Sequence, residues 1–151
     1  MTLLDDARAG DLTVFRCRIT TRNRGGFVGV ARGNELVTDD EDEALAAVIA
    51  AWGYGVKRTV SAIEVARVAG FLEGVREAAR PVLTQADIDE IGNAEWRQQV
   101  ALPREITVDG NPGVEYWNRS GQPPLWRSQL VVGKDGAPEI TVKPIGQFLA
   151  H

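Results

Sequence analysis

The sequence predicts a single α+β domain spanning residues 1–151, with a mainly antiparallel sheet and two or three helices packed on one face. Segments rich in β-branched and aromatic residues open and close the chain, and alanine-rich helical segments lie between them. This order lacks the regular strand–helix alternation of a parallel doubly wound sheet. No linker is long enough to divide the 151 residues, and a content of 44% hydrophobic and 25% charged residues is typical of one globular domain.

The first β region is predicted from residue 12 to residue 38. Its strands are expected at 12–19, 27–31 and 35–37, and the glycine-containing stretches between them have the composition of turns. Cys17 is the only cysteine, so the chain cannot form an intrachain disulfide. Alternation along the first strand puts Cys17 on the same face as Phe15 and Ile19, and we expect that face to belong to the core.

The middle of the chain predicts two long helices. Five acids at 39–43 precede an alanine-rich segment that ends at Gly53, and carboxylates favour the first turn of a helix. Ser61 and Glu64 have the spacing of a capping box, which predicts a second helix running to about Ala79. Small residues spaced by four within this helix should let the first helix approach it closely (Ala66, Gly70, Gly74).

The rest of the chain predicts a short third helix from Thr84 to about Gly92, followed by an antiparallel meander. The strands of the meander are expected at 104–108, 113–119, 125–132 and 139–143, with turn-forming residues at 109–112, 120–124 and 134–136. These short connections make neighbouring strands antiparallel.

The rarest residues exclude several kinds of chemistry. The only histidine is His151, the last residue, where chain ends are usually frayed. Ser-His-Asp and Cys-His catalysis need an imidazole held beside the nucleophile, and zinc sites usually need several His or Cys ligands. We therefore name no catalytic residue, no metal site and no cofactor, and we do not expect an enzyme. Catalysis by two carboxylates stays open, because the sequence does not show which of the 21 acids face each other.

Charge and hydropathy limit the partners and the compartment. No uncharged apolar stretch approaches the ~20 residues that a membrane span needs. Asp5 and Asp6 stand where a signal peptide would carry a basic segment, so we expect a cytoplasmic location. The net charge of −4 argues against a dedicated nucleic-acid binder. Contact between nucleic acid and the arginine-rich turn near residue 22 is therefore our third-ranked hypothesis.

Two segments are candidates for binding a partner protein. The first is the acidic run, which serves as a helix start and also offers a negative surface to a basic partner (Asp39, Asp40, Glu41, Asp42, Glu43). The second lies around the turn at 120–124 and contains residue types enriched at binding hot spots (Trp117, Arg119, Trp126, Arg127). One face of the strand before this turn should be core. The residues left outside would form a contact patch, unless they pack against the domain.

An alternative site for an anionic small molecule lies in the first predicted turn. Arg22, Arg24, Gly25 and Gly26 could cradle a phosphate or carboxylate group through backbone N–H groups and guanidinium charge. These glycines sit between two predicted strands, whereas a dinucleotide-binding loop sits between a strand and a helix. A hairpin turn with solvated arginines explains the same residues. A small-molecule-binding protein or enzyme is therefore the second hypothesis.

With its acidic run at 39–43 and its tryptophan–arginine segment at 115–127, the chain resembles the small immunity proteins that neutralise bacterial polymorphic toxins. The resemblance is one of overall style, since those proteins are compact cytoplasmic α+β domains that are often acidic. It implies a non-catalytic module that binds and occludes a cognate toxin enzyme, such as a nuclease or an NAD-consuming enzyme. It assigns no role to individual residues.

Overall fold

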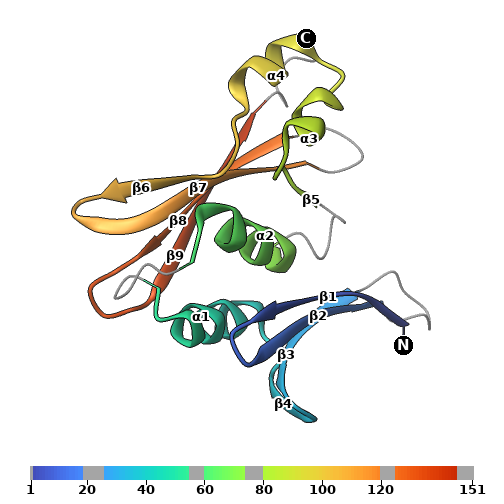
Figure 1. The fold of residues 1–151 in the computed structure, drawn as a ribbon, viewed down its shortest axis with the longest axis vertical. Coiled ribbons are helices and arrows are strands. Elements are labelled where there is room, and N and C mark those ends of the chain that lie inside the picture. Colours follow the sequence, from blue (N-terminus) through green and yellow to red (C-terminus); the bar gives the residue numbers. More distant parts are fainter. Residues whose placement is uncertain (1, 19–25, 55–59, 74–79, 120–124, 146–151) are drawn as a thin grey trace.

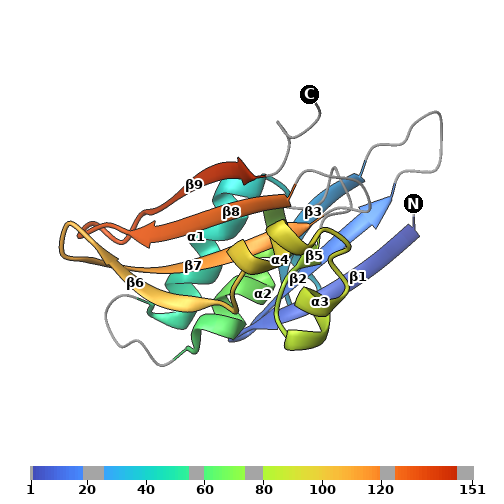
Figure 2. The same cartoon turned by 90° about the horizontal axis from the view of Figure 1, so that it is seen from above.

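A computed structural model describes residues 2–18, 26–54, 60–73, 80–119 and 125–145. Over this part of the chain it confirms a single α+β domain, with four helices and two antiparallel sheets. The two longer helices lie between the sheets, so that each sheet has one face covered by them (Figure 1). Seen from above, the strands of the second sheet lie across these two helices (Figure 2).

The first sheet contains the predicted N-terminal strands and one further strand. In order across the sheet, its strands are β1 (Thr2–Ala9), β2 (Leu12–Arg18), β3 (Gly26–Arg32) and β4 (Glu35–Thr38). β1 is not among the predicted strands, because two acids and an arginine interrupt its apolar residues. A two-residue turn joins it to β2: Ala9 pairs with Leu12, and Gly10 has a φ of 61°, which glycine adopts without steric cost.

The core face of β2 differs from the predicted one. Leu12 and Val14 are fully buried, whereas Phe15, on the alternate face, is partly buried. The Phe15 ring covers Gly29 on the neighbouring strand, where a Cβ atom would lie 2.4 Å from Phe15 Cζ. Cys17 also belongs to β2, but its side chain lies outside the described part of the structure. The prediction that the Phe15 face forms the core is therefore wrong.

Helix α1 (Glu41–Trp52) begins and ends where the sequence predicts. The Asp40 side chain accepts a hydrogen bond from the Glu43 N–H at 3.0 Å, which satisfies a donor that the first turn leaves unpaired. Gly53 ends the helix in the left-handed conformation, with a φ of 63°. The buried residues recur every three or four positions and form one apolar face (Ala44, Leu45, Val48, Ile49).

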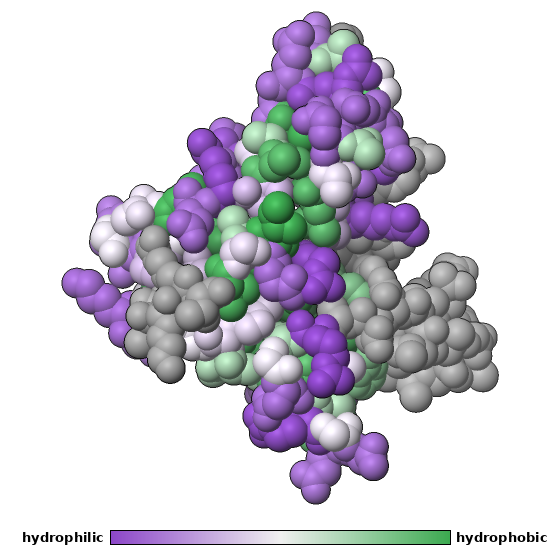
Figure 3. Space-filling view, viewed as in Figure 1, coloured by the Kyte–Doolittle hydropathy of each residue, from purple (hydrophilic) through white to green (hydrophobic). Residues whose placement is uncertain are grey.

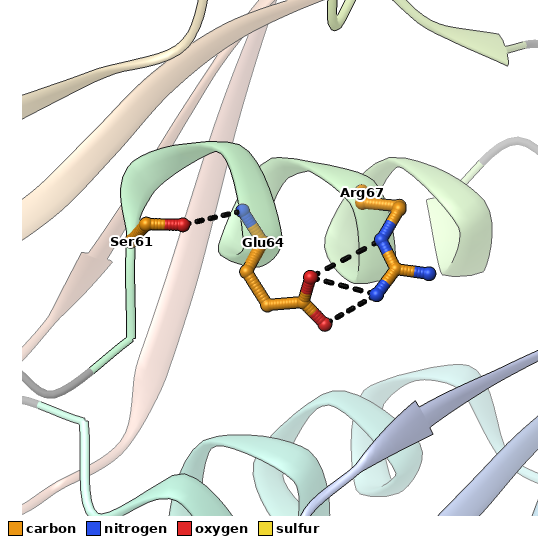
Figure 4. Close-up of polar contacts among 3 residues, drawn as sticks. All are labelled: Ser61, Glu64 and Arg67. Atoms are coloured by element: carbon orange, nitrogen blue, oxygen red, sulfur yellow. Dashed lines mark hydrogen bonds and ion pairs between the residues drawn. The ribbon is translucent and has the colours of Figure 1, made fainter.

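Helix α2 (Ala62–Glu73) begins after the predicted cap, but only one of the two hydrogen bonds of a capping box is present. The Glu64 N–H donates to Ser61 Oγ at 3.2 Å. The Glu64 carboxylate points along the helix instead of back toward Ser61, and it accepts hydrogen bonds from the Arg67 guanidinium (Figure 4). An ion pair one turn apart thus replaces the expected return bond. Residues 74–79, the predicted end of this helix, lie outside the described residues.

At Gly70 the close neighbour of α2 is the second sheet. A Cβ atom on Gly70 would lie 2.7 Å from Pro81 Cβ and 2.9 Å from Asn118 Oδ1. Gly70 therefore lets α2 approach two strands of that sheet. The sequence predicts instead that this glycine allows close packing against the first helix. The two helices do contact each other, but the side of Gly70 where a Cβ atom would stand faces the second sheet.

The second sheet contains the predicted meander and one short additional strand. Its strands are β5 (Arg80–Pro81), β6 (Arg104–Val108), β7 (Asn111–Arg119), β8 (Leu125–Val132) and β9 (Pro138–Ile145). β7 is central, with β8 along one edge and both β5 and β6 along the other. Asp109 and Gly110, which join β6 to β7, have φ angles of 52° and 80°, as in the type I′ turns that favour hairpins.

Two short helices lie beside one end of the second sheet, at the top of Figure 1. α3 (Gln85–Asp89) is predicted by the sequence and has a complete capping box between Thr84 and Asp87. α4 (Ala94–Gln99) is not among the predicted helices. Asn93 caps it by accepting hydrogen bonds from the Glu95 and Trp96 N–H groups. The asparagine is a signal that the sequence carries and our prediction missed.

The main hydrophobic core extends from one sheet to the other and includes the buried faces of the two helices between them. Val14 and Val30 of the first sheet belong to the same buried cluster as Tyr116 and Leu130 of the second. A second cluster lies on the opposite face of the second sheet, under the short helices (Val82, Ile88, Ile91, Val100, Trp117, Leu125). In Figure 3, hydrophobic side chains form a band between the α3–α4 end and α2. Both faces of β7 are therefore covered near its C-terminal end.

Candidate functional site

The segment from β4 to the first turn of α1 forms a strongly acidic surface, which we call the acidic corner. Its six carboxylates are all on exposed residues (Glu35, Asp39, Asp40, Glu41, Asp42, Glu43). No Lys, Arg or His occurs between residues 33 and 54. Two of the acids also hold the local backbone: Asp40 caps α1, and the Glu43 carboxylate accepts a hydrogen bond from Thr38 Oγ1 at 2.7 Å. The predicted acidic run is thus exposed to solvent, and hydrogen bonds of Asp40 and Glu43 fix the backbone that carries it.

Apolar side chains lie next to the acidic corner. Leu36 and Val37 of β4 are 59% and 44% exposed, which is unusual for large aliphatic residues on a strand. β4 is the last strand in the described part of the first sheet and pairs there only with β3. Such an edge presents unpaired backbone N–H and C=O groups. Because side chains alternate along a strand, the corner combines negative charge, one exposed aliphatic side chain on each face of β4 and an open strand edge.

The predicted tryptophan–arginine patch does not form as a unit, and Trp117 lies in the interior. Trp117 is 5% exposed and belongs to the second core cluster. The sequence predicts that one face of this strand is core, but the structure buries both. α2 covers one face, and the α3–α4 region covers the other. The assignment of Trp117 to an exposed contact patch is therefore corrected.

The other three residues of the patch lie in different surroundings. Trp126 and Arg127 are adjacent on β8 and so point to opposite faces of the sheet. Trp126 is partly buried, on the face that also carries Asn118. Arg119 donates a hydrogen bond to Glu90, just after α3, at 2.5 Å. Arg127 lies directly opposite Trp117, and its side chain is 38% exposed.

A buried carboxylate beside Arg127 is missing from the predicted site residues. Glu115 of β7 is 3% exposed at its side chain. Its Oε2 accepts a hydrogen bond from Arg104 Nε of β6 at 2.7 Å, and its Oε1 accepts one from Gln129 Nε2 of β8 at 2.9 Å. Arg127 Nε lies 3.8 Å from Oε1, beyond hydrogen-bond distance. The cluster draws on three strands, and no single segment of the sequence shows the register that assembles it.

The predicted site for an anionic ligand falls almost wholly outside the described residues. Arg22, Arg24 and Gly25 are not described, and Gly26 begins β3 opposite Arg18 of β2. The antiparallel pairing of β2 with β3 agrees with the hairpin that the sequence predicts around these residues.

The described part of the chain contains neither a cluster of metal-ligating side chains nor a membrane-spanning helix. There, no group of three or more His, Cys, Asp or Glu side chains is arranged to hold a metal ion, and this includes the acidic corner. Across the same residues, no helix reaches the length and hydropathy of a membrane-spanning segment.

Comparison with known proteins finds no protein-family model, curated protein or solved structure that matches the chain.

Proposed function

We propose that this protein is a non-catalytic binding module whose acidic corner engages the basic surface of a partner protein. The observation that carries the proposal is the exposure of Leu36 and Val37 directly beside six carboxylates. Protein interfaces combine an apolar centre with a polar rim. Opposite charge on the partner speeds encounter and selects against wrong partners.

Helix capping explains part of the acidic corner and leaves the rest for another role. Asp40 and Glu43 make the capping contacts, and acids in the first turn are favoured by the helix dipole. Glu35 and Asp39 precede the cap and do not contribute to it in this way. Nor does capping require two exposed aliphatic side chains on the strand before it. A binding surface accounts for all of these features together.

The chemistry of the partner follows from the charge of the corner. The corner has six carboxylates, and the adjacent cation, Arg32, already forms an ion pair with Asp11. Such a surface attracts a basic protein and repels a second copy of itself. Enzymes that act on nucleic acids or other phosphate-bearing substrates use Lys and Arg to bind them. The partner in this proposal is a toxin-like enzyme of that kind, a nuclease or an NAD-consuming enzyme. The corner would occlude its substrate site, as an immunity-type inhibitor does.

Complex formation with the protein encoded by the neighbouring gene tests the proposal. Size-exclusion chromatography and calorimetry at physiological salt should show a complex with the wild-type chain. Asp39→Asn/Asp42→Asn should weaken that complex at least about fivefold, because interfacial charge pairs contribute on this scale. Asp40 and Glu43 stay unchanged in this variant, so that α1 keeps its cap. Circular dichroism verifies that the variant is folded.

A matched control separates a docking surface from an effect of net charge. Glu95→Gln/Glu139→Gln removes two charges from exposed positions on α4 and β9, away from the corner. This control should bind within about twofold of the wild type, since the charges lie outside the proposed interface. No complex with the wild-type chain, or equal weakening by both double variants, overturns the proposal.

A further inference from the structure

The face of the second sheet that points away from α2 carries cations on neighbouring strands. The register places Arg127 of β8 directly opposite Lys143 of β9 on one side and Trp117 of β7 on the other. Like charges directly opposite one another destabilise a pair of strands. The pair formed by Arg127 and Lys143, which we call the cation pair, therefore calls for a counter-charge.

The acids on this face leave the cation pair largely uncompensated. Glu115 is the nearest, but Arg104 and Gln129 take its hydrogen bonds, and Arg104 already matches its single charge. Glu139 lies four residues from Lys143 on the same strand, which is about 13 Å along its axis. Among the described residues, the cation pair thus has only the 3.8 Å contact between Arg127 and Glu115 to offset its charge.

One hydrogen-bond donor of Arg127, its Nε–H group, is not used by the protein itself. Its Nε atom is buried and has no hydrogen-bond partner. The side chain is nevertheless 38% exposed, so its solvent-accessible part lies away from the buried Nε. Glu115 Oε1 lies 3.8 Å from this Nε atom, and Trp117 stands directly opposite Arg127 in the strand register. The buried Nε–H is out of a ligand's reach, so an anion would contact the exposed part of the guanidinium, whose charge the protein leaves largely uncompensated.

We propose that the cation pair binds an oxyanion, the phosphate or carboxylate group of a small molecule. Arginine offers a planar fork that matches such a group, and lysine adds a compact positive charge. Thr141 lies on the same face of β9, opposite Gln129, and offers a hydroxyl group at the rim. The site is in the second sheet and uses no residue of the acidic corner. It therefore stands independently of the proposed partner.

Titration of the folded protein with inorganic phosphate tests this site. We expect the Arg127 Nε–H and Lys143 amide NMR signals to shift saturably at constant ionic strength, with sodium chloride as the reference. Acetate in a parallel titration distinguishes the two ligand groups. A saturable response to phosphate, to acetate or to both supports the site and identifies the group it prefers. Absence of a saturable response to either anion overturns it.

Three variants separate a built site from general attraction to positive charge. Lys143 is exposed, so Lys143→Gln should fold normally and weaken binding roughly tenfold, as expected on losing a charge-assisted contact. Arg127→Lys keeps the charge but loses the fork, and it should weaken binding by a similar factor. The control Lys134→Gln alters an exposed lysine in the turn after β8 and should bind within about twofold of the wild type. Equal weakening by Lys134→Gln, or unchanged binding in Lys143→Gln, overturns the site.

Discussion

Gly70 sets the distance between α2 and the second sheet. A glycine inside a helix normally costs about 1 kcal/mol relative to alanine, so its presence needs a reason. The reason is steric: a Cβ atom at this position would lie 2.7 Å from Pro81 Cβ, closer than carbon atoms pack. The same Cβ atom would lie 2.9 Å from Asn118 Oδ1, so a second neighbour also leaves no room for it. The helix could accept a side chain here only by moving away from the sheet.

Gly70→Ala is therefore expected to destabilise the protein by about 1–3 kcal/mol, the usual cost of overpacking a core. The sign is informative, because helix propensity alone would make the change stabilising by up to about 1 kcal/mol. Urea unfolding followed by far-UV circular dichroism measures the difference. The control Gly92→Ala places its Cβ in open space and should change stability by less than about 0.5 kcal/mol. A neutral or stabilising Gly70→Ala would contradict the steric argument.

At the scale of single elements, α3 depends on its cap because it is only five residues long. The Asp87 carboxylate accepts hydrogen bonds from the Leu83 and Thr84 N–H groups at 2.9 and 3.0 Å. Burial acts to raise the pKa of Asp87 and is the largest single influence. The hydrogen bonds from Leu83 and Thr84, together with the charge of Arg119, outweigh it and hold the pKa below its ordinary value of 3.8. Asp87 thus stabilises the fold in its ionised form.

Asp87→Asn should cost about 1 kcal/mol near neutral pH, the usual loss for a helix cap. The folded-state pKa is lower than the unfolded one, so the stabilisation by Asp87 is complete above about pH 4. It is lost as the pH falls through the lowered folded-state value. The difference between wild type and variant should therefore shrink below pH 4 in urea unfolding measured from pH 7 to pH 2.5. Asp89→Asn, on the same helix but exposed, is the control, and a pH-independent difference for Asp87→Asn would refute this role.

Elements whose signals are local could be predicted closely. The end of α1 at Gly53 and the hairpin turn at Asp109-Gly110 depend on positive φ angles that only a few residue types adopt readily. β1 could not be recognised in the same way, because its strand character comes from pairing with β2 and not from its own composition. The small Gly-Asp turn at 10–11 is the one local sign of that hairpin.

The candidate sites were harder to predict, because burial depends on what covers both faces of a strand. Trp117 belongs to a residue type that fills cores as well as binding surfaces, and only the placement of the short helices over it decides between the two. The exposure of the acidic run could be predicted, since carboxylates at a helix start remain in water. Its role in binding a partner stays a prediction. The Glu115 cluster required the register of three strands, which no local pattern encodes.

At the scale of the whole molecule, the two proposed surfaces have opposite charge and lie on different sheets. The acidic corner belongs to the first sheet and the start of α1, and the cation pair belongs to the outer face of the second. A chain with a net charge of −4 therefore still presents a local positive site. Ligands of either sign can be attracted to different parts of it, because exposed charges more than about 10 Å apart are largely screened from one another at physiological salt.

Both surfaces depend on a core that the two sheets share, and this predicts that the sheets unfold together. Val30 of the first sheet and Leu130 of the second are fully buried in the same cluster. Val30→Ala and Leu130→Ala should each lower the free energy of unfolding by about 2–4 kcal/mol, as expected for truncation in a packed core. Each should shift one common transition, because a continuous core makes the domain cooperative.

Two probes of urea unfolding test this cooperativity. Three of the four tryptophans lie in the second sheet or the short helix beside it, so fluorescence reports mainly on that side (Trp96, Trp117, Trp126). Far-UV circular dichroism reports on both sheets. The two probes should give coincident transitions in the wild type and in both core variants, and the exposed control Val142→Ala should leave the midpoint nearly unchanged. If Val30→Ala moved the dichroism transition and left the fluorescence transition in place, the sheets would be separate folding units, because its effect would then stop at the helices.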